Sequence, residues 1–252
     1  MSMSIAYDCH THTTFSDGRN SLIENVRAAE ACGLECVAIT DHFFEPGEWF
    51  EQMLSGVEAA RQWSSTKVLA GAEATILNLD GETTIDDWHA GALDFVLADF
   101  GERTQGVAAE PPATKARLID NVVTAMVNAC KNPVVNAIAH PFNLGRVPGD
   151  LHLSDIPRAS LEIVGQALAE SETAFEIMNQ MYWWWPEEPV HRFMSGYVEL
   201  VRVLRDTDAK FVLGSDAHSA GAVGNLTWAL HVVEQAEVPP AQIVNLARLG
   251  PQ

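Results

Sequence analysis

Short apolar runs alternate along the chain with longer segments of mixed polarity. The runs of strand length cover about residues 5–7, 35–40, 67–72, 93–100, 134–139, 174–178 and 211–214. The longer segments predict helices at about residues 21–32, 49–63, 113–131, 161–170, 189–205 and 228–235. Strands that alternate with helices favour a mainly parallel sheet. Seven strand-helix repeats predict a closed or nearly closed α/β barrel of seven strands, and we expect a single domain over residues 1–252.

Local signals agree with this division. Ser21 is followed three residues later by Glu24, which is typical of a capping box at the start of a helix, and Gly33 is typical of a helix end. The pair Asp80-Gly81 predicts a hairpin that leaves the third strand.

His, Asp and Glu residues recur where the apolar runs end. They are His10 and His12 after the first run, Asp41 and His42 after the second, Glu73 after the third, His140 after the fifth, and Asp216 and His218 after the seventh. The carboxyl ends of parallel strands meet at one face of a barrel, so we expect these side chains to converge. His10 and His12 also point to the same side of an extended segment. Imidazole and carboxylate groups together predict a divalent metal site, although His42 or His140 alone would be interpreted as a hydrogen-bonded core residue.

The chain is strongly acidic, with 34 Asp and Glu against 15 Lys and Arg and a net charge of −19. Proteins bind long nucleic acids through Lys and Arg that neutralise phosphates. No basic stripe offsets the acidity, so long nucleic acid is not an expected partner. Divalent cations would offset part of the local negative charge, and a small anionic substrate therefore stays compatible.

Targeting signals are not evident. No apolar run approaches the roughly 18 residues of a membrane span, and the first residues lack the order of a signal peptide. We therefore expect a cytoplasmic enzyme without a membrane partner. Cys9, Cys32, Cys36 and Cys130 form no C-x-x-C pair, which favours buried thiols in a reducing compartment over disulfides or a thiolate zinc site.

Six short motifs lie along nearly the whole chain. They are D-x-H-x-H-T-x-x-S-D-G at 8–18, I-T-D-H at 39–42, G-x-E at 71–73, I-A-H-P at 138–141, F-E-I-x-N at 175–179 and G-S-D-A-H at 214–218. In this order they resemble the PHP family, which is named for polymerase and histidinol phosphatase. The resemblance implies a distorted (β/α)7 barrel, phosphoesterase activity and up to three metal ions at the carboxyl ends of the strands.

The resemblance also implies which residues hold each ion. His10, His12, Glu73 and Asp216 would surround the first ion, and Glu73 would bridge to a second ion that also takes His140. The third ion would be held by Asp17, His42 and His218. Zn, Mn and Fe all suit such ligands, so we expect two or three divalent ions of one of these metals.

The fourth predicted strand departs from the family pattern. The family usually ends this strand in a His that binds the second ion, whereas here the strand runs into Gly101. Asp99 lies two residues earlier on the same strand face and is the possible substitute ligand, with Glu102 or a water as alternatives.

The expected mechanism is hydrolysis. Closely spaced divalent ions lower the pKa of a bridging water, and the resulting hydroxide attacks phosphorus. Asp216, or a water network through His218, would manage protons as the catalytic groups.

Substrate contacts are predicted from the loops at the same end. Arg19, Arg103 and Arg146 are candidates for binding phosphate, although solvated surface roles suit them as well. Trp184, in the aromatic run 182–186, would contact substrate, or this run would form a hydrophobic plug or a contact in a homo-oligomer.

Together these features favour a metal-dependent phosphoesterase of a small phosphorylated metabolite, such as a phosphomonoester or a short nucleotide. Two alternatives stay open. One is a degenerate PHP protein that binds metal or ligand without turnover, and the other is a metal-dependent hydrolase of a non-phosphate bond.

Overall fold

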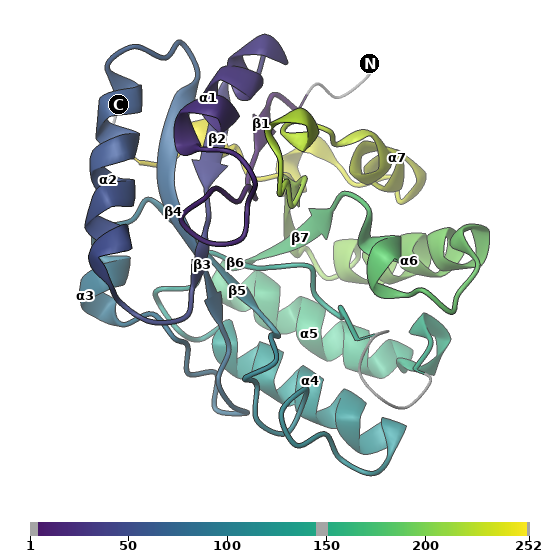
Figure 1. The fold of residues 1–252 in the computed structure, drawn as a ribbon. Helices are drawn as coiled ribbons and strands as arrows, with labels where there is room; N and C mark the ends of the chain where they lie inside the picture. The colour runs from purple at the N-terminus through teal and green to yellow at the C-terminus, as the bar shows by residue number, and fades with distance from the viewer. Residues whose placement is uncertain (1–4, 145–150, 251–252) are drawn as a thin grey trace.

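The computed structural model describes residues 5–144 and 151–250, and its parallel strands curl into a nearly closed barrel (Figure 1). The strands follow the order β1-β2-β4-β5-β6-β7-β8, and β3 lies off this path beside β4. They are β1 (Tyr7–Asp8), β2 (Cys36–Ile39), β3 (His42–Phe43), β4 (Lys67–Thr75), β5 (Phe95–Asp99), β6 (Ala137–Ile138), β7 (Ala174–Met178) and β8 (Lys210–Gly214). The predicted α/β barrel of seven strands is confirmed.

The barrel closes between the first and last strands. Thr11 and Ala217 form an isolated parallel bridge just beyond β1 and β8, and the N–H of His12 donates to the carbonyl of Ala217 at 2.9 Å. The buried carboxylate of Asp8 accepts a hydrogen bond from the N–H of Ser215 at 2.9 Å. This seam places the residues that follow β1 beside those that follow β8.

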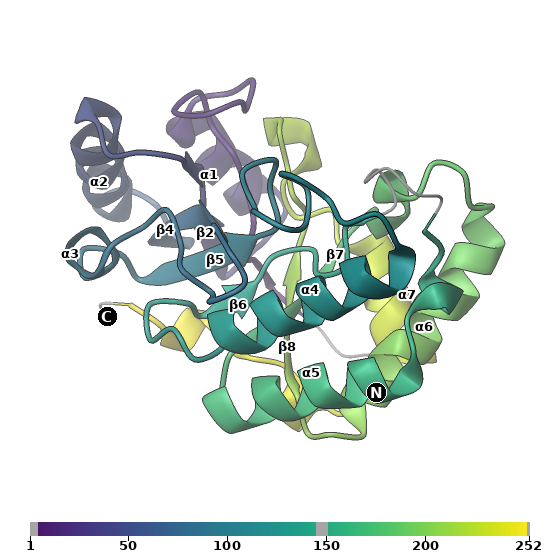
Figure 2. The ribbon, with the colours of Figure 1, turned by 90° about the horizontal axis from the view of Figure 1, so that it is seen from below.

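The helices cover the outside of the barrel. They are α1 (Leu22–Ala31), α2 (Glu48–Arg61), α3 (Asp87–Ala90), α4 (Lys115–Ala129), α5 (Arg158–Ser171), α6 (Val190–Arg205) and α7 (Thr227–Gln235). Figure 2 shows α4 and α5 side by side beneath the later strands. The strands are therefore buried on both faces, as all four residues of β2 illustrate. In the described ranges, no helix has the length and apolar character that crossing a membrane requires.

The start of α1 has the predicted capping box. The side chain of Ser21 accepts a hydrogen bond from the N–H of Glu24, and the Glu24 carboxylate accepts one from the N–H of Ser21 at 2.8 Å. Such a cap satisfies backbone groups that the first helical turn leaves unpaired.

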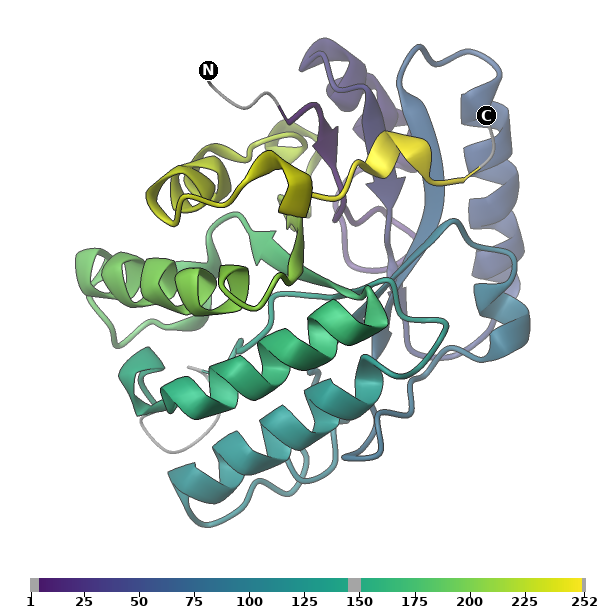
Figure 3. The same cartoon turned by 180° about the vertical axis from the view of Figure 1, so that it is seen from behind.

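The C-terminal segment crosses the amino end of the barrel, as Figure 3 shows in yellow. The N–H of Val244 donates to the carbonyl of Phe211 at 2.9 Å, and Nζ of Lys67 donates to the carbonyl of Ala247 at 3.1 Å. Since Phe211 and Lys67 lie at the starts of their strands, this segment covers part of the amino end and leaves the carboxyl end to the loops.

Two details differ from the expectation. The predicted strand over residues 134–139 has regular pairing only at Ala137 and Ile138, and the backbone of His140 just beyond it lies in the left-handed region. The N–H groups of Asn136 and Ala139 still donate to β5, so the sheet continues. Strand β3 was not predicted, since His42 and Phe43 lie beyond the apolar run.

Candidate metal centre

The carboxyl ends of the strands bring together three groups of side chains with metal-ligand chemistry. The groups are His10, His12 and Glu73; Glu73, Asp99 and His140; and His12, Asp17, His42 and His218. Within each group the ligand atoms lie within 4.8 Å of one another. Because Glu73 and His12 each belong to two groups, the three form one continuous cluster.

The first group joins the ends of β1, β4 and β8. The Nε2 atoms of His10 and His12 are 3.0 Å apart, so at most one of them can carry a hydrogen. Asp216 approaches the same point, with its Oδ1 3.2 Å from Nε2 of His12 and 3.6 Å from Nε2 of His10. Oε2 of Glu73 lies 3.4 Å from Nε2 of His10 and 3.5 Å from Nε2 of His12. Four donors therefore converge on one point.

The carboxylate of Glu73 tests whether a cation fits. Its Oε2 lies 2.8 Å from Nδ1 of His42, and its Oε1 lies 2.9 Å from Nε2 of His140. Neither oxygen has a hydrogen bond of acceptable geometry to any described residue, although the side chain is only 1% exposed. A buried carboxylate without hydrogen bonds is strongly destabilising unless another charge compensates it. In the metal-free protein the protonated His42 supplies such a charge, and divalent cations between Glu73 and the imidazoles would replace it, so the donors present fit metal ions.

The second group contains Asp99, the predicted substitute for the His expected two residues later, at position 101. Asp99 ends β5 and is buried, and its Oδ1 has no hydrogen bond to the described residues. A Cβ added at Gly101 would lie 3.2 Å from Oδ2 of Asp99. A side chain at 101 would therefore enter the space that the Asp99 carboxylate takes, and the glycine leaves that space open.

The third group is more open than the other two. Oδ2 of Asp17 lies 3.1 Å from Nε2 of His218 and 3.6 Å from Nε2 of His42. The side chains of Asp17 and His218 are 53% and 40% exposed, whereas that of His42 is 20% exposed. This group thus faces the solvent at the mouth of the barrel.

In the third group, the contacts between the carboxylate and the imidazoles shift the pKa values of both. The hydrogen bond from His218 and the close contact with His42 hold the pKa of Asp17 far below its usual range. The bond to Asp17 raises the pKa of His218 to about 9. Burial lowers the pKa of His42, but the charge of Glu73 and the Asp17 contact outweigh it and raise the value to about 11. Without cations, protons therefore occupy these imidazoles, and metal binding has to displace them.

At Asp99, the carboxyl group behaves in the opposite way from that of Asp17. Burial, followed by the charge of Glu73, raises the pKa of Asp99 to about 6. Two neighbouring carboxylates in a dry site repel each other, so a cation between Asp99 and Glu73 would favour the ionised form of both.

Two of these residues have unusual backbone conformations. His140 has φ of 27° and Asp216 has φ of 53°, both in the left-handed region that non-glycine residues rarely adopt. Each such residue is destabilising by about 1–3 kcal/mol, and such residues cluster at functional sites. These backbone conformations turn one ligand candidate after β6 and one after β8 into the cluster.

Of the predicted substrate contacts, Arg103 lies at the mouth beside the third group. It lines a cavity of about 430 Å³ together with Phe15, Asp17, His42 and Phe44. Its Nη1 donates to the carbonyl of Phe44 at 3.2 Å, and its guanidinium lies 5.2 Å from the centre of the Phe44 ring. The Phe44 ring in turn stacks on His42 at 4.9 Å. The guanidinium is thus held next to the ligand candidates.

The other predicted substrate contacts differ in where they lie. Trp184 ends the 3-10 helix η2 (Met181–Trp184), and its ring centre lies 5.2 Å from that of His140. Arg19 is exposed, and its N–H donates to the carbonyl of His218 at 2.9 Å. Arg146 lies outside the described residues.

Glu176 is a residue of the site that the sequence prediction missed. It occupies the middle of β7, is wholly buried, and has Oε1 2.8 Å from Nδ1 of His10. The available signals were its position as the single acidic residue inside the apolar run 174–178 and its place in the F-E-I-x-N motif.

Asp41 holds a loop rather than an imidazole. Its carboxylate accepts hydrogen bonds from the N–H of Thr13 at 2.8 Å and from Oγ of Ser16 at 2.6 Å. These bonds fix the loop that carries Asp17 into the third group.

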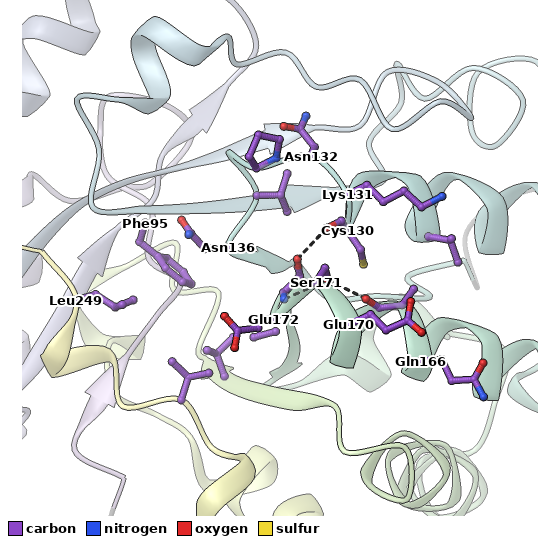
Figure 4. Close-up of a pocket in the computed structure, with 18 of the residues that line it drawn as sticks. Phe95, Cys130, Lys131, Asn132, Asn136, Gln166, Glu170, Ser171, Glu172 and Leu249 are labelled. Carbon is purple, nitrogen blue, oxygen red and sulfur yellow. Dashed lines mark hydrogen bonds between the residues drawn. The ribbon is translucent and has the colours of Figure 1, made fainter.

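A second cavity, of about 910 Å³, lies at the opposite end of the barrel (Figure 4). Phe95 and Ala174, the first residues of β5 and β7, and Asn136, just before β6, line it together with Lys131 and Glu170. None of the three groups of ligand candidates found among the described residues lies there. Space alone therefore does not mark the site.

Comparison with known proteins agrees with this geometry. The PHP domain model matches residues 8–138. A probable phosphatase of Shewanella sp. strain MR-4 is 29% identical over 246 residues, which cover 96% of this chain and 88% of that protein. A probable phosphatase of Acetivibrio thermocellus is 27% identical over 259 residues, which cover 96% and 92%.

Solved structures share the fold. The histidinol phosphate phosphatase of Lactococcus lactis, solved with zinc, L-histidinol and phosphate, superimposes with a TM-score of 0.66 at 19% identity and covers 98% of this chain and 99% of its own. A putative histidinol phosphatase of Listeria monocytogenes gives a TM-score of 0.56 at 14% identity, covering 87% and 97%. Because the PHP model covers more than half of the sequence and its motifs meet at one end of the barrel, the chain belongs to the PHP domain family.

Proposed function

We infer that this protein is a metal-dependent phosphatase that hydrolyses a small phosphorylated metabolite. The observation that carries this proposal is the carboxylate of Glu73, which faces four imidazole groups while neither of its oxygens forms a hydrogen bond to a described residue. The names of the relatives, probable phosphatases, support the same reaction class.

The ligand assignment follows the three groups. His10, His12, Glu73 and Asp216 would hold the first ion; Glu73, Asp99 and His140 the second; and Asp17, His42 and His218 the third. Divalent ions in such sites polarise phosphoryl oxygens and lower the pKa of water. Zn, Mn and Fe remain the candidate metals.

The chain's own side chains would orient the substrate and move the proton. Arg103 is fixed by Phe44 at the mouth and would bind the non-bridging phosphoryl oxygens through its guanidinium. Asp216, with a side chain 12% exposed, is the group that we propose to accept the proton of the attacking water. A water network beside His218, which is more exposed than Asp216, would carry that proton to solvent.

Phosphomonoesters and short nucleotides are the proposed substrates. The cavity at the mouth holds about 430 Å³ and is walled by aromatic side chains, which suits a small molecule with a planar part. Trp184 forms a second aromatic wall near His140.

The test combines metal content with turnover. Protein purified without a metal-affinity tag is analysed for metals and assayed for phosphate release from sugar, amino-alcohol and nucleotide phosphates. We expect two or three equivalents of metal and turnover, both lost in His12→Ala and kept in the matched control His231→Ala, whose side chain is exposed on α7. Metal uptake without turnover of any phosphoester would instead indicate a binding protein, and turnover of esters, lactones or amides alone would indicate another hydrolase.

A further inference from the structure

Glu176 is a buried acidic residue that the proposed reaction does not use. It lies at the centre of β7, between Phe175 and Ile177, and its side chain is 0% exposed. An acid is rarely placed inside a barrel unless its charge and its hydrogen-bonding capacity are satisfied. Its surroundings are therefore informative.

Three donors meet the Glu176 carboxylate. Nδ1 of His10 lies 2.8 Å from Oε1, and the backbone N–H of His140 donates to Oε2 at 2.6 Å. The thiol of Cys9 donates to Oε1 at 3.9 Å. Each of its two oxygens thus accepts from a different ligand candidate, one on the β1 side of the cluster and one on the β6 side.

The bond to His10 determines which ring nitrogen is free. A carboxylate can only accept, so Nδ1 of His10 carries a hydrogen, and in the neutral ring that binds metal Nε2 keeps its lone pair. Nε2 is the atom that faces His12, Glu73 and Asp216 in the first group. Glu176 therefore aims the lone pair of His10 at the point where the other donors converge.

The bond to His140 acts on the backbone. His140 has φ of 27°, a strained conformation that persists only where its surroundings hold it. Its N–H is held by Glu176, while its Nε2 reaches Oε1 of Glu73 in the second group. The same carboxylate that orients His10 therefore also supports the turn that presents His140.

Gly214 leaves room for this arrangement. A Cβ added at Gly214, the last residue of β8, would lie 2.1 Å from Oε1 of Glu176 and 2.6 Å from Cβ of His10. No side chain fits there while the carboxylate and the imidazole keep their positions.

We propose that Glu176 is a positioning residue that sets the His10 tautomer and the His140 backbone together, so that one carboxylate organises two metal groups, with Gly214 as its necessary neighbour. The proposal rests on the proposed function, because it takes both groups to bind metal. Partners of this kind change metal affinity by about 10- to 100-fold when they are removed.

The experiment measures zinc affinity of the full chain by competition with a chromophoric chelator. In Glu176→Gln the amide oxygen can accept from only one of the two donors, and its NH2 group opposes the other. We expect Glu176→Gln and Gly214→Ala each to weaken zinc binding by about 10- to 100-fold. Glu234→Gln, on the exposed face of α7, is the matched control and should bind as the wild type does.

A purely structural role would lower the unfolding temperature of the metal-free protein and leave zinc affinity unchanged, which would overturn the proposal. Should the variants not fold, nitrogen-15 NMR of histidine in the zinc-loaded wild type decides. We expect a hydrogen on Nδ1 and zinc on Nε2 of His10, and zinc on Nδ1 would contradict the role of Glu176. Zinc uptake without phosphate release in the wild type would refute the proposed function alone, since the tautomer can still be measured.

Discussion

The two ends of the barrel differ in a way that volume does not reveal. The amino end has a cavity of about 910 Å³, more than twice the 430 Å³ of the cavity at the carboxyl-end mouth. Its polar groups are bonded in ordinary ways, as when the hydroxyl of Thr173 donates to the carbonyl of Cys130. The carboxyl end instead collects buried carboxylates and imidazoles, among which both oxygens of Glu73 and Oδ1 of Asp99 have no hydrogen bond to the described residues.

The contrast shows which end of the barrel has features that destabilise the metal-free protein. Strained backbone at His140 and Asp216 and the repulsion between the buried carboxylates of Asp99 and Glu73 destabilise the metal-free carboxyl end. A protein retains such features where a ligand compensates for them. The amino end has the space for a ligand but no comparable cost to compensate, so we assign the chemistry to the carboxyl end.

The sharpest test of the contrast replaces one Glu by Gln at each end of the barrel, in separate variants. Glu73→Gln removes the negative charge shared by the metal groups and should lower phosphatase activity by more than about 100-fold, since even indirect partners of metal ligands are worth 10- to 100-fold. Glu170→Gln, at the edge of the amino-end cavity, should leave kcat/KM within about 2-fold, as surface substitutions usually do. Comparable losses in both variants would erase the distinction between the two ends.

A smaller effect is expected within the carboxyl end. Asp99→Ala should remove one metal equivalent and reduce kcat by about 10- to 100-fold, because the second group would keep only Glu73 and His140. Elemental analysis and steady-state kinetics measure both. Asp120→Ala, exposed on α4, is the control, and an unchanged metal content in Asp99→Ala would show that Asp99 is no ligand.

Substituting a residue that contacts substrate should have a smaller effect than substituting a metal ligand. Arg103→Ala should raise KM by about 10-fold while metal content stays the same, since a charge-assisted bond to phosphate is worth about 1.5–3 kcal/mol. Arg103→Lys should recover part of this, because an ammonium keeps the charge but loses the bidentate geometry. The control is Arg117→Ala, whose side chain is exposed on α4. If KM does not change relative to this control, the Arg103 guanidinium does not contact phosphate.

The smallest effect concerns pH in the metal-free protein. Pairing with Asp17 raises the pKa of His218 to about 9, above its ordinary value near 6.5. The pair therefore contributes stability that is fully present below about pH 6.5 and is lost as pH rises through about 9. Because both side chains are well exposed, the contribution should stay below about 1 kcal/mol.

Thermal unfolding of Asp17→Asn and the wild type, both stripped of metal, measures this effect between pH 5.5 and 10. The difference between them should shrink as pH increases. A constant difference would mean that the pair seen at the mouth does not form in solution.

Much of this arrangement could be predicted from sequence because it follows strand ends. The apolar runs locate the strands, and the polar residue that ends each run must lie at the carboxyl face, as His10, Glu73 and His140 do. The helix ends also follow local chemistry, as the cap at Ser21 does.

The rest depends on contacts between distant segments. Nothing in the sequence around Glu176 shows that its carboxylate meets His10 and His140, because the pairing of β7 with its neighbours creates those distances. The same holds for Asp99, which the sequence offered as one of several substitutes. Its orientation toward Glu73 follows from the register of β4 and β5.

The seam between β1 and β8 has a consequence for how the protein matures. The first metal group needs His10 from the start of the chain and Asp216 from near its end, and the bridge between Thr11 and Ala217 holds them together. A nascent chain leaving the ribosome cannot assemble this group until β8 has emerged. Such distant contacts also slow folding. Capture of the first proposed ion should therefore follow the synthesis of β8, and a chain that ends before β8 would lack one of the ligand candidates for that ion.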